Sequence, residues 1–206
     1  HHLVPATTYQ STNNTETGEN NDVERLNKDR VALNCFFDEE AFPQILPLKK
    51  HISKITNLPL ENQEAFNLIK YDKGGKYDQH YDSSNPPLTS ESPRVYSFIF
   101  YLNEDFEGGE TNFPNLDGRN IIPKKGKMVY WKNVDDNQNL DYDSLHSGVP
   151  VKEGVKWILT MWVRDDNIYN NTPEHPLVFN STYVPLTNPN YGYSILKVPD
   201  PILRYI

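Results

Sequence analysis

Short apolar runs separated by turn-forming residues dominate the chain from Phe66 onward. Runs of this length, bounded by Gly, Pro, Asn and Asp, are typical of β-strands. The run Val95–Leu102 is apolar on both faces and is expected at the centre of a sheet, and Met128–Trp131 is a further strand candidate. Before them, Gln44–Thr56 carries apolar residues at helical spacing, with Pro47 near its start. The pattern predicts a mainly β fold with a flanking helix (α+β) around a double-stranded β-helix (jelly-roll) core.

A lysine interrupts the apolar strand candidate Val155–Val163. With period-two alternation, Lys156 shares a face of this strand with Ile158 and Trp162. An isolated buried ammonium is costly, so a lysine in an apolar layer is expected either to lose its proton or to pair with an anion. The strand therefore predicts an anion-binding position at Lys156.

Two histidines and one aspartate form a candidate metal site. In an extended segment, side chains two residues apart point the same way, so His80 and Asp82 can bind one ion together. His146 would complete the set from a distant strand. Two imidazoles and one carboxylate are the ligands that hold non-haem Fe(II) on one face and leave positions open for a co-substrate and O₂. The spacing of His80 and Asp82 alone has low specificity, because the chain holds six histidines and 28 acidic residues.

Further motifs accompany these residues in a fixed order along the chain. They are Glu64–Tyr71, Tyr71–Tyr77, Arg94–Asn103, Gly108–Pro114, Pro123–Gly126, His146–Pro150 and Lys156–Trp157. With His80 and Asp82 among them, the stretch from Glu64 to Arg164 resembles the prolyl 4-hydroxylase family of Fe(II)/2-oxoglutarate-dependent dioxygenases. A collinear series of motifs argues against a chance match.

The resemblance implies a set of site residues. His80, Asp82 and His146 would bind Fe(II), and Lys156 would pair with the distal carboxylate of 2-oxoglutarate, so these four form the expected catalytic set. The residues expected to hydrogen-bond 2-oxoglutarate are Tyr71 and Thr111, and those expected near the substrate are Glu64, Tyr77, Arg94 and Trp162.

The resemblance also implies a reaction. The enzyme would use Fe(II), 2-oxoglutarate and O₂, with ascorbate as reductant, to hydroxylate C4 of a peptidyl proline and release succinate and CO₂. Lys156 favours a prolyl substrate, because related lysyl hydroxylases usually carry arginine at this position. Asp82 favours hydroxylation, because related halogenases replace this carboxylate to make room for a halide. The expected partner is a proline-containing peptide or protein.

Other interpretations of these residues stay open. Tyr71 and Thr111 could instead satisfy buried backbone groups, Arg94 could only begin a strand, Glu64 could lie on a solvated face, and Trp162 could belong to the core. Two alternative functions also remain. One is an oxygenase of the same fold that acts on a free amino acid or another small molecule, and the other is a catalytically silent peptide-binding module.

Composition narrows the class of partner. A net charge of −8 argues against a nucleic-acid partner, because phosphate contacts need clustered Lys and Arg. No apolar run is long enough to span a membrane. The single cysteine, Cys35, excludes an intramolecular disulfide and fits a cytoplasmic or otherwise reducing compartment. The Asn, Lys, Ile and Tyr bias suits a microbe or a large virus, and the oligomeric state is not predicted.

The chain divides into three expected regions. Residues 1–30 are polar with few apolar anchors, which predicts a flexible N-terminal segment. Residues 31–165 are the expected dioxygenase catalytic domain. Residues 166–206 form a Pro/Tyr-rich C-terminal extension, which could wrap the core, cover a sheet edge or bind a partner.

Overall fold

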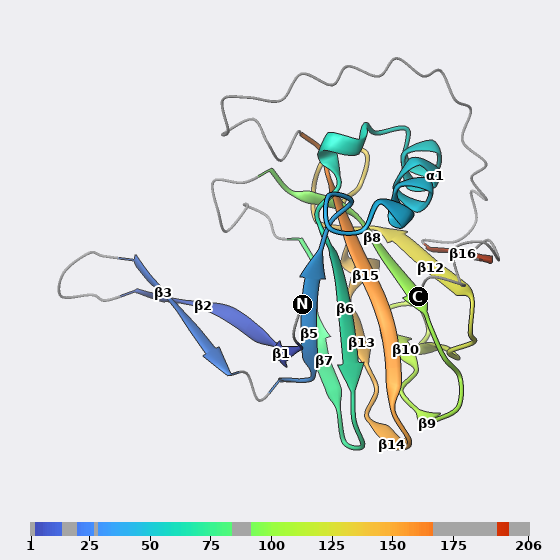
Figure 1. Cartoon of the computed structure of the whole chain (residues 1–206). Helices are drawn as coiled ribbons and strands as arrows, with labels where there is room; N and C mark the ends of the chain where they lie inside the picture. The colour runs from blue at the N-terminus through green and yellow to red at the C-terminus, as the bar shows by residue number, and fades with distance from the viewer. Residues whose placement is uncertain (1–2, 14–19, 27–28, 84–91, 167–192, 198–206) are drawn as a thin grey trace.

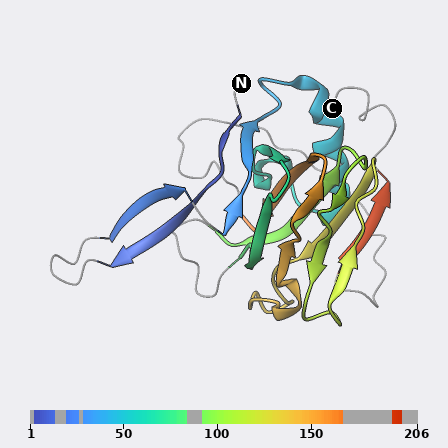
Figure 2. The ribbon, with the colours of Figure 1, turned by 90° about the horizontal axis from the view of Figure 1, so that it is seen from below.

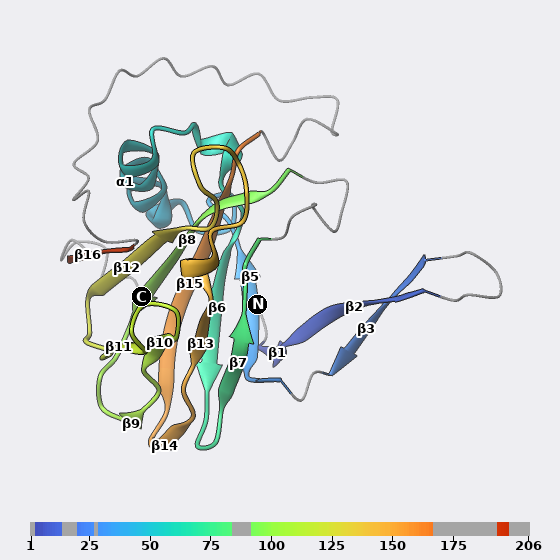
Figure 3. The same ribbon diagram turned by 180° about the vertical axis from the view of Figure 1, so that it is seen from behind.

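Two antiparallel sheets form the core of the computed structural model, which describes residues 3–13, 20–26, 29–83, 92–166 and 193–197 (Figure 1). Within these residues, the larger sheet has the strand order β1 (Val4–Pro5), β5 (Leu33–Phe37), β6 (Phe66–Tyr71), β15 (Lys156–Arg164), β8 (Arg94–Tyr101), β12 (Lys127–Lys132) and β16 (Tyr193–Lys197). The smaller sheet, which faces the viewer in Figure 3, has the order β11 (Arg119–Ile121), β10 (Thr111–Phe113), β13 (His146–Gly148), β7 (Lys76–His80) and β4 (Arg30–Val31). Two short pairs complete the strands, β9 (Glu107–Gly108) with β14 (Val151–Glu153) and β2 (Thr7–Asn13) with β3 (Asn20–Leu26). The predicted mainly β fold with a jelly-roll core is confirmed.

The central strand β8 is buried on both faces. It pairs with β15 on one side and with β12 on the other. Phe98 and Phe100 belong to one apolar cluster, whereas Ile99 and Tyr101 belong to a second. Successive side chains of a strand point to opposite faces, so one strand can serve two cores. The position predicted for Val95–Leu102 from its unbroken apolar run is confirmed.

The two apolar clusters explain the layering of the fold. The first includes residues of α1 (Leu46–Thr56), and the second includes residues of β10 and β11. Figure 2 accordingly shows α1 and the smaller sheet on opposite sides of the larger sheet. Strand β15 follows the predicted alternation, with Leu159 and Met161 in the first cluster and Ile158 in the second. The face that carries Lys156 is therefore the face between the two sheets.

The flanking helix begins slightly later than its apolar spacing predicts. Pro43–Ile45 forms the 3-10 turn η1, and α1 follows directly with Pro47 in its first turn. Proline is tolerated there because the first N–H groups of a helix have no intrahelical acceptor. The helix ends at Asn57, whose left-handed φ of 57° terminates the hydrogen-bond pattern. A second 3-10 turn, η2 (Leu60–Asn62), leads into β6.

Strands occur within residues 1–30, which the sequence predicts as a flexible segment. Strand β1 pairs with β5, β4 pairs with β7, and β2 and β3 form a hairpin that projects from the sheets in Figures 1 and 3. Low apolar content does not prevent this pairing, because backbone groups supply the hydrogen bonds of a ladder whatever the side chains are. The expected boundary after residue 30 falls inside β4, and β1 and β4 pair with strands of the two main sheets.

Part of the C-terminal extension covers a sheet edge. Strand β16 pairs antiparallel with β12 at the end of the larger sheet. Covering an edge in this way satisfies N–H and C=O groups that would otherwise be exposed for association with another chain. The rest of the predicted extension lies outside the described residues. In the described part of the chain, no helix has the length and apolar character needed to cross a bilayer.

Replacing Leu159 by Ala tests the packing of the first cluster. Leu159 is 0% exposed, so the substitution removes buried methyl groups and leaves a cavity between α1 and the larger sheet. We expect a loss of about 2 to 5 kcal/mol in the free energy of unfolding, measured by urea denaturation. The control is Ile122→Ala at a side chain that is 68% exposed, where the change should stay within about 0.5 kcal/mol. Equal effects of the two substitutions would contradict this account of the core.

Candidate active site

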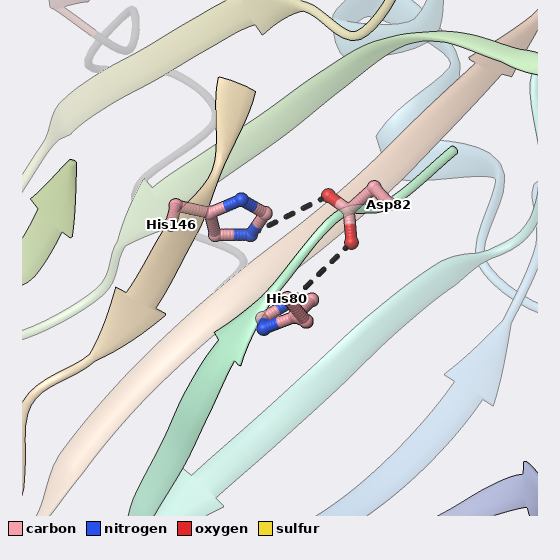
Figure 4. A group of neighbouring side chains, drawn as sticks. All are labelled: His80, Asp82 and His146. Atoms are coloured by element: carbon pink, nitrogen blue, oxygen red, sulfur yellow. Dashed lines mark ion pairs between the residues drawn. The ribbon is translucent and has the colours of Figure 1, made fainter. Parts of the chain in front are cut away.

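Two neighbouring strands of the smaller sheet bring the candidate metal ligands together. Strands β7 and β13 are antiparallel, and His80 is paired with His146 in their register. Asp82 follows two residues after His80, just beyond the end of β7. One ligand atom from each of the three residues lies within 4.8 Å of the others, and Figure 4 shows the three side chains converging. The structure therefore assembles the predicted set from two distant parts of the chain.

Hydrogen bonds orient both imidazoles toward Asp82. The Nδ1 of His80 lies 2.7 Å from the Asp78 carbonyl oxygen, and that of His146 lies 2.9 Å from the Ser144 carbonyl oxygen. A carbonyl only accepts, so each Nδ1 donates and each Nε2 keeps a free lone pair. The Nε2 atoms lie 3.5 Å (His80) and 3.6 Å (His146) from the carboxylate oxygens of Asp82, as the dashed lines in Figure 4 mark. This is the tautomer that binds a metal ion.

The charge states of the cluster also suit a cation. Burial disfavours ionisation of Asp82, but the adjacent His146 and His80 outweigh it and hold the pKa of this carboxyl well below its usual range. Burial, together with the charge of His80, lowers the pKa of His146 to about 4. At neutral pH the carboxylate is ionised and His146 is neutral, as metal ligands must be.

A hydrogen-bond chain from the larger sheet positions Asp82. The Ser97 hydroxyl on β8 donates to Oδ2 of Asp82 at 2.6 Å. The Asn133 amide in turn donates to the Ser97 oxygen at 2.8 Å. Ser97 and Asn133 are 1% and 0% exposed, so no bulk water competes for these bonds. The chain restricts the carboxylate to an orientation in which it faces both imidazoles.

Aromatic rings pack against the two histidines. The Tyr77 ring stacks on His80 with centroids 3.6 Å apart and planes 19° apart. The Trp131 ring meets His146 edge to face at 4.6 Å. These contacts leave each imidazole little freedom to rotate away from Asp82.

Lys156 is buried in the same cavity without a counter-charge. It lies on β15 opposite Tyr71 of β6, is 3% exposed, and donates to the Gly109 carbonyl oxygen at 2.6 Å. Among the described residues, no carboxylate forms an ion pair with it. Burial lowers the pKa of Lys156 to about 8, against a weaker opposing effect of Glu110. In the folded structure Lys156 therefore still requires an anion, as its place in an apolar strand predicts.

The residues expected to hydrogen-bond 2-oxoglutarate surround this lysine. The Tyr71 ring centroid lies 5.2 Å from the Lys156 Nζ. The Thr111 hydroxyl shares a hydrogen bond of 2.7 Å with the Tyr101 hydroxyl, which positions it at the cavity wall. Eight of the ten predicted site residues line one cavity: Tyr71, Tyr77, His80, Asp82, Thr111, His146, Lys156 and Trp162.

The other two predicted residues, Glu64 and Arg94, are not among those that line the cavity. The Glu64 carboxylate accepts from Arg94 Nε and Nη2 at 2.7 and 2.8 Å, and it lies 2.8 Å from Nε of Arg164. The Arg94 guanidinium lies over the Trp162 ring, 4.0 Å from its centroid. Glu64 is therefore in a partly buried ion-pair network and not on a solvated face. Trp162 and Tyr77 line the cavity directly, whereas Arg94 contacts the Trp162 ring and Glu64 pairs with Arg94.

Several residues of the site were not singled out from the sequence. Ser97 and Asn133 support Asp82, and Trp131 and Arg30 line the cavity. Ser97 carried a usable signal, because it is a polar residue inside an otherwise apolar strand. Arg30 carried none, because it lies beyond the expected catalytic domain and only strand pairing brings it to the site.

An antiparallel jelly roll with a cluster of two histidines and one carboxylate defines the class of non-haem Fe(II) oxygenases. The sequence model of the 2OG-Fe(II) oxygenase superfamily matches residues 66–164. This match and the relatives named below support the prolyl 4-hydroxylase family of these oxygenases for the chain. That family implies Fe(II), 2-oxoglutarate and O₂ as the metal and co-substrates.

Similarity to individual proteins supports this assignment. The chain is 36% identical over 136 residues to probable prolyl 4-hydroxylase 9 of Arabidopsis thaliana, which covers 58% of this chain and 47% of that protein. It is 32% identical over 131 residues to a putative prolyl 4-hydroxylase of Acanthamoeba polyphaga mimivirus, covering 60% of this chain and 54% of the relative. It spans about half the length of these curated relatives.

A solved structure shares the fold. The viral collagen prolyl hydroxylase of Paramecium Bursaria Chlorella virus-1, solved as its 2OG complex, aligns with a TM-score of 0.59 and 29% identity. The alignment covers 66% of this chain and 80% of that one.

The residues present fit a divalent cation and an anionic co-substrate. The histidine–aspartate cluster offers a charged carboxylate and an oriented imidazole pair. The remaining cavity contains donors that lack acceptors, since Arg30 Nε and Trp131 Nε1 are buried without a hydrogen-bond partner. Buried donors without acceptors are rare in folded proteins and are expected where an acceptor-rich ligand binds.

Replacing Ser97 by Ala tests the support of Asp82. Loss of the hydroxyl frees the carboxylate to rotate, and outer hydrogen bonds of this kind typically contribute about 10- to 100-fold to metal affinity. We expect Mn(II) affinity, measured by isothermal titration calorimetry, to fall by about that factor. Ser53→Ala, at a hydroxyl on α1 that accepts from Gln63, is the matched control. Unchanged affinity in the Ser97 variant would show that the hydrogen bond does not position the ligand.

Proposed function

We propose that this chain is an Fe(II)- and 2-oxoglutarate-dependent oxygenase that hydroxylates a peptidyl proline at C4. The observation that carries the proposal is one cavity with a cation-binding cluster at His80, Asp82 and His146 and an uncompensated cation at Lys156. Prolyl 4-hydroxylase is also the name of the curated relatives. Succinate and CO₂ are the co-products of this reaction, and ascorbate is the proposed reductant.

The two histidines and Asp82 hold Fe(II) in this proposal. The oriented Nε2 atoms and the ionised carboxylate would supply the protein ligands, a set that is typical of Fe(II) sites that also bind a co-substrate. Fe(II), when bound, supplies the activation of O₂ that oxidises 2-oxoglutarate and the substrate C–H bond. The protein's own contribution is to fix the ligand orientation through Ser97 and the carbonyl groups of Asp78 and Ser144.

Lys156 selects a dicarboxylate co-substrate. Its ammonium is desolvated, so pairing with a carboxylate restores the stabilisation that water would provide. Tyr71 and Thr111 hydroxyls line the same part of the cavity and hydrogen-bond that carboxylate. With its far end held here, the keto acid end is directed toward the metal cluster.

Two tyrosines near the ligand segment, outside the cavity lining, support a peptide substrate in this proposal. Tyr81 lies between His80 and Asp82 in the sequence. Its ring meets the Tyr142 ring edge to face, with centroids 6.2 Å apart. Tyr142 lies in the 3-10 turn η3 (Tyr142–Ser144) and is 70% exposed, while its carbonyl oxygen accepts from the Asn115 amide at 2.6 Å. Aromatic-lined surfaces of this kind bind proline-rich segments in extended polyproline conformation.

Mass spectrometry of proline-containing peptides tests the reaction. The peptides, collagen-like and poly-proline, are incubated with the protein, Fe(II), 2-oxoglutarate and O₂. We expect a mass gain of one oxygen atom, localised to proline, and loss of that gain in His146→Ala because the metal is no longer held.

Three results would redirect the proposal. If the oxygen is absent from proline but succinate forms above the His146→Ala background, the substrate is a different molecule. If neither product forms although peptide binds, the chain is a silent binding module. Full activity in His146→Ala would exclude the metal cluster.

The pKa of Lys156 predicts a pH dependence of co-substrate binding. The ammonium is charged below its folded pKa of about 8 and neutral above it, so the attraction for a carboxylate is lost as pH rises through that value. We expect anaerobic affinity for 2-oxoglutarate to fall by about tenfold for each pH unit above this pKa. The Lys156→Arg variant stays charged and should lose this dependence. Equal pH dependence in the two proteins would assign the effect to another group.

A further inference from the structure

Arg30 contributes a second buried cation to the cavity. It lies on β4, paired with Tyr77 of β7, and is only 9% exposed. It lines the same cavity as Lys156 and the metal cluster. The residue falls outside the stretch 66–164 that matches the oxygenase superfamily, so a function for it is not implied by that match.

The contacts of Arg30 connect it to the residues around the co-substrate position. It lines the cavity together with Tyr71, and its charge acts to lower the pKa of that phenol against the larger effect of burial. Its guanidinium carbon lies 4.9 Å from the centroid of the Tyr77 ring, which itself stacks on His80. Its Nε is buried without a partner, and no carboxylate forms an ion pair with it in the described part of the chain. Burying a cation without a counter-charge has a large desolvation cost. Because Arg30 lines the cavity, we expect it to have a role there.

A hydrogen bond between Arg30 and Tyr71 would have only one possible direction. A guanidinium has donors and no acceptor, so the Tyr71 oxygen must accept. The Tyr71 hydrogen is then free to be donated to another group. Burial raises the pKa of Tyr71, so the phenol keeps this hydrogen at neutral pH. Lys156, on the strand beside Tyr71, uses one donor on the Gly109 carbonyl oxygen and has further donors, so a ligand acceptor placed here receives hydrogen bonds from both residues.

We propose that Arg30 is a positioning residue that fixes the Tyr71 hydroxyl as a donor to the distal carboxylate of 2-oxoglutarate. The co-substrate site then extends from Lys156 through Tyr71 to the N-terminal strand β4. A buried cation behind a hydroxyl polarises it and strengthens the bond it donates. This inference rests on the proposed function, because it takes 2-oxoglutarate as the ligand.

Calorimetric titration of the Mn(II)-loaded protein with two keto acids tests the role. The first is 2-oxoglutarate, and the second is 2-oxopentanoate, which has the same chain length without the distal carboxylate. In Arg30→Met we expect affinity for 2-oxoglutarate to fall about tenfold and affinity for 2-oxopentanoate to stay the same. Arg30→Lys, which keeps a donor and a charge, should recover part of the loss. Lys50→Met, at an exposed lysine on α1, should change neither titration.

A double-mutant cycle with Tyr71→Phe tests whether Arg30 acts through Tyr71. We expect Arg30→Met to cost nothing further once the hydroxyl is absent, so the double variant should bind 2-oxoglutarate as Tyr71→Phe does. Additive losses would overturn the proposed route through Tyr71. Equal weakening of both keto acids by Arg30→Met would also overturn it, because it would indicate general damage to the site.

The outcomes separate this inference from the function on which it rests. Tight binding of 2-oxoglutarate by the parent protein, with the same affinity in Arg30→Met, would overturn the role of Arg30 alone. Absence of 2-oxoglutarate binding by the Mn(II)-loaded parent would overturn the proposed function, and the role of Arg30 with it.

Discussion

The antiparallel register of β7 and β13 is the constraint on which the rest of the site depends. It places His80 opposite His146, and their ring centroids lie 4.2 Å apart. Side chains alternate between the faces of a strand, so a slip of one residue would turn one histidine away from the other. Asp82 can complete the cluster only because it follows β7 directly and is drawn toward the larger sheet by Ser97. The metal cluster is thus a consequence of how the two sheets face each other.

Two opposite charges are buried in the cavity without neutralising each other. Asp82 carries the negative charge beside two imidazoles, and Lys156 carries the positive charge beside Tyr71. Both charges are desolvated, and local hydrogen bonds offset only part of the desolvation cost of each. A fold optimised for stability alone would place apolar residues at such positions. In the proposed function, a cation binds beside Asp82 and a dicarboxylate extends from that cation to Lys156. Together they offset the desolvation costs of both buried charges, which gives the proposed reaction its physical basis.

Support for the cavity comes from segments that carry no ligand themselves. The central strand β8 supplies Ser97, and the loop after β12 supplies Asn133. The N-terminal strand β4 supplies Arg30, although its surroundings in the sequence are polar and predicted a flexible segment. Such positions are recognised only in three dimensions, because a hydrogen bond to a ligand residue leaves no periodic pattern in the chain.

The sequence by itself determined the strands of the core, the inward face of Lys156 and the identity of the candidate ligands. Alternation of apolar residues is a local property, and collinear motifs are visible without coordinates. Only the tertiary structure decided that Glu64 pairs with the Arg94 that lies over Trp162, and that Arg30 lines the same cavity as Tyr71. It also decided that the N-terminal residues join both sheets. The physical reason is that strand partners and buried charge pairs are selected by the packing of distant segments, which no local pattern encodes.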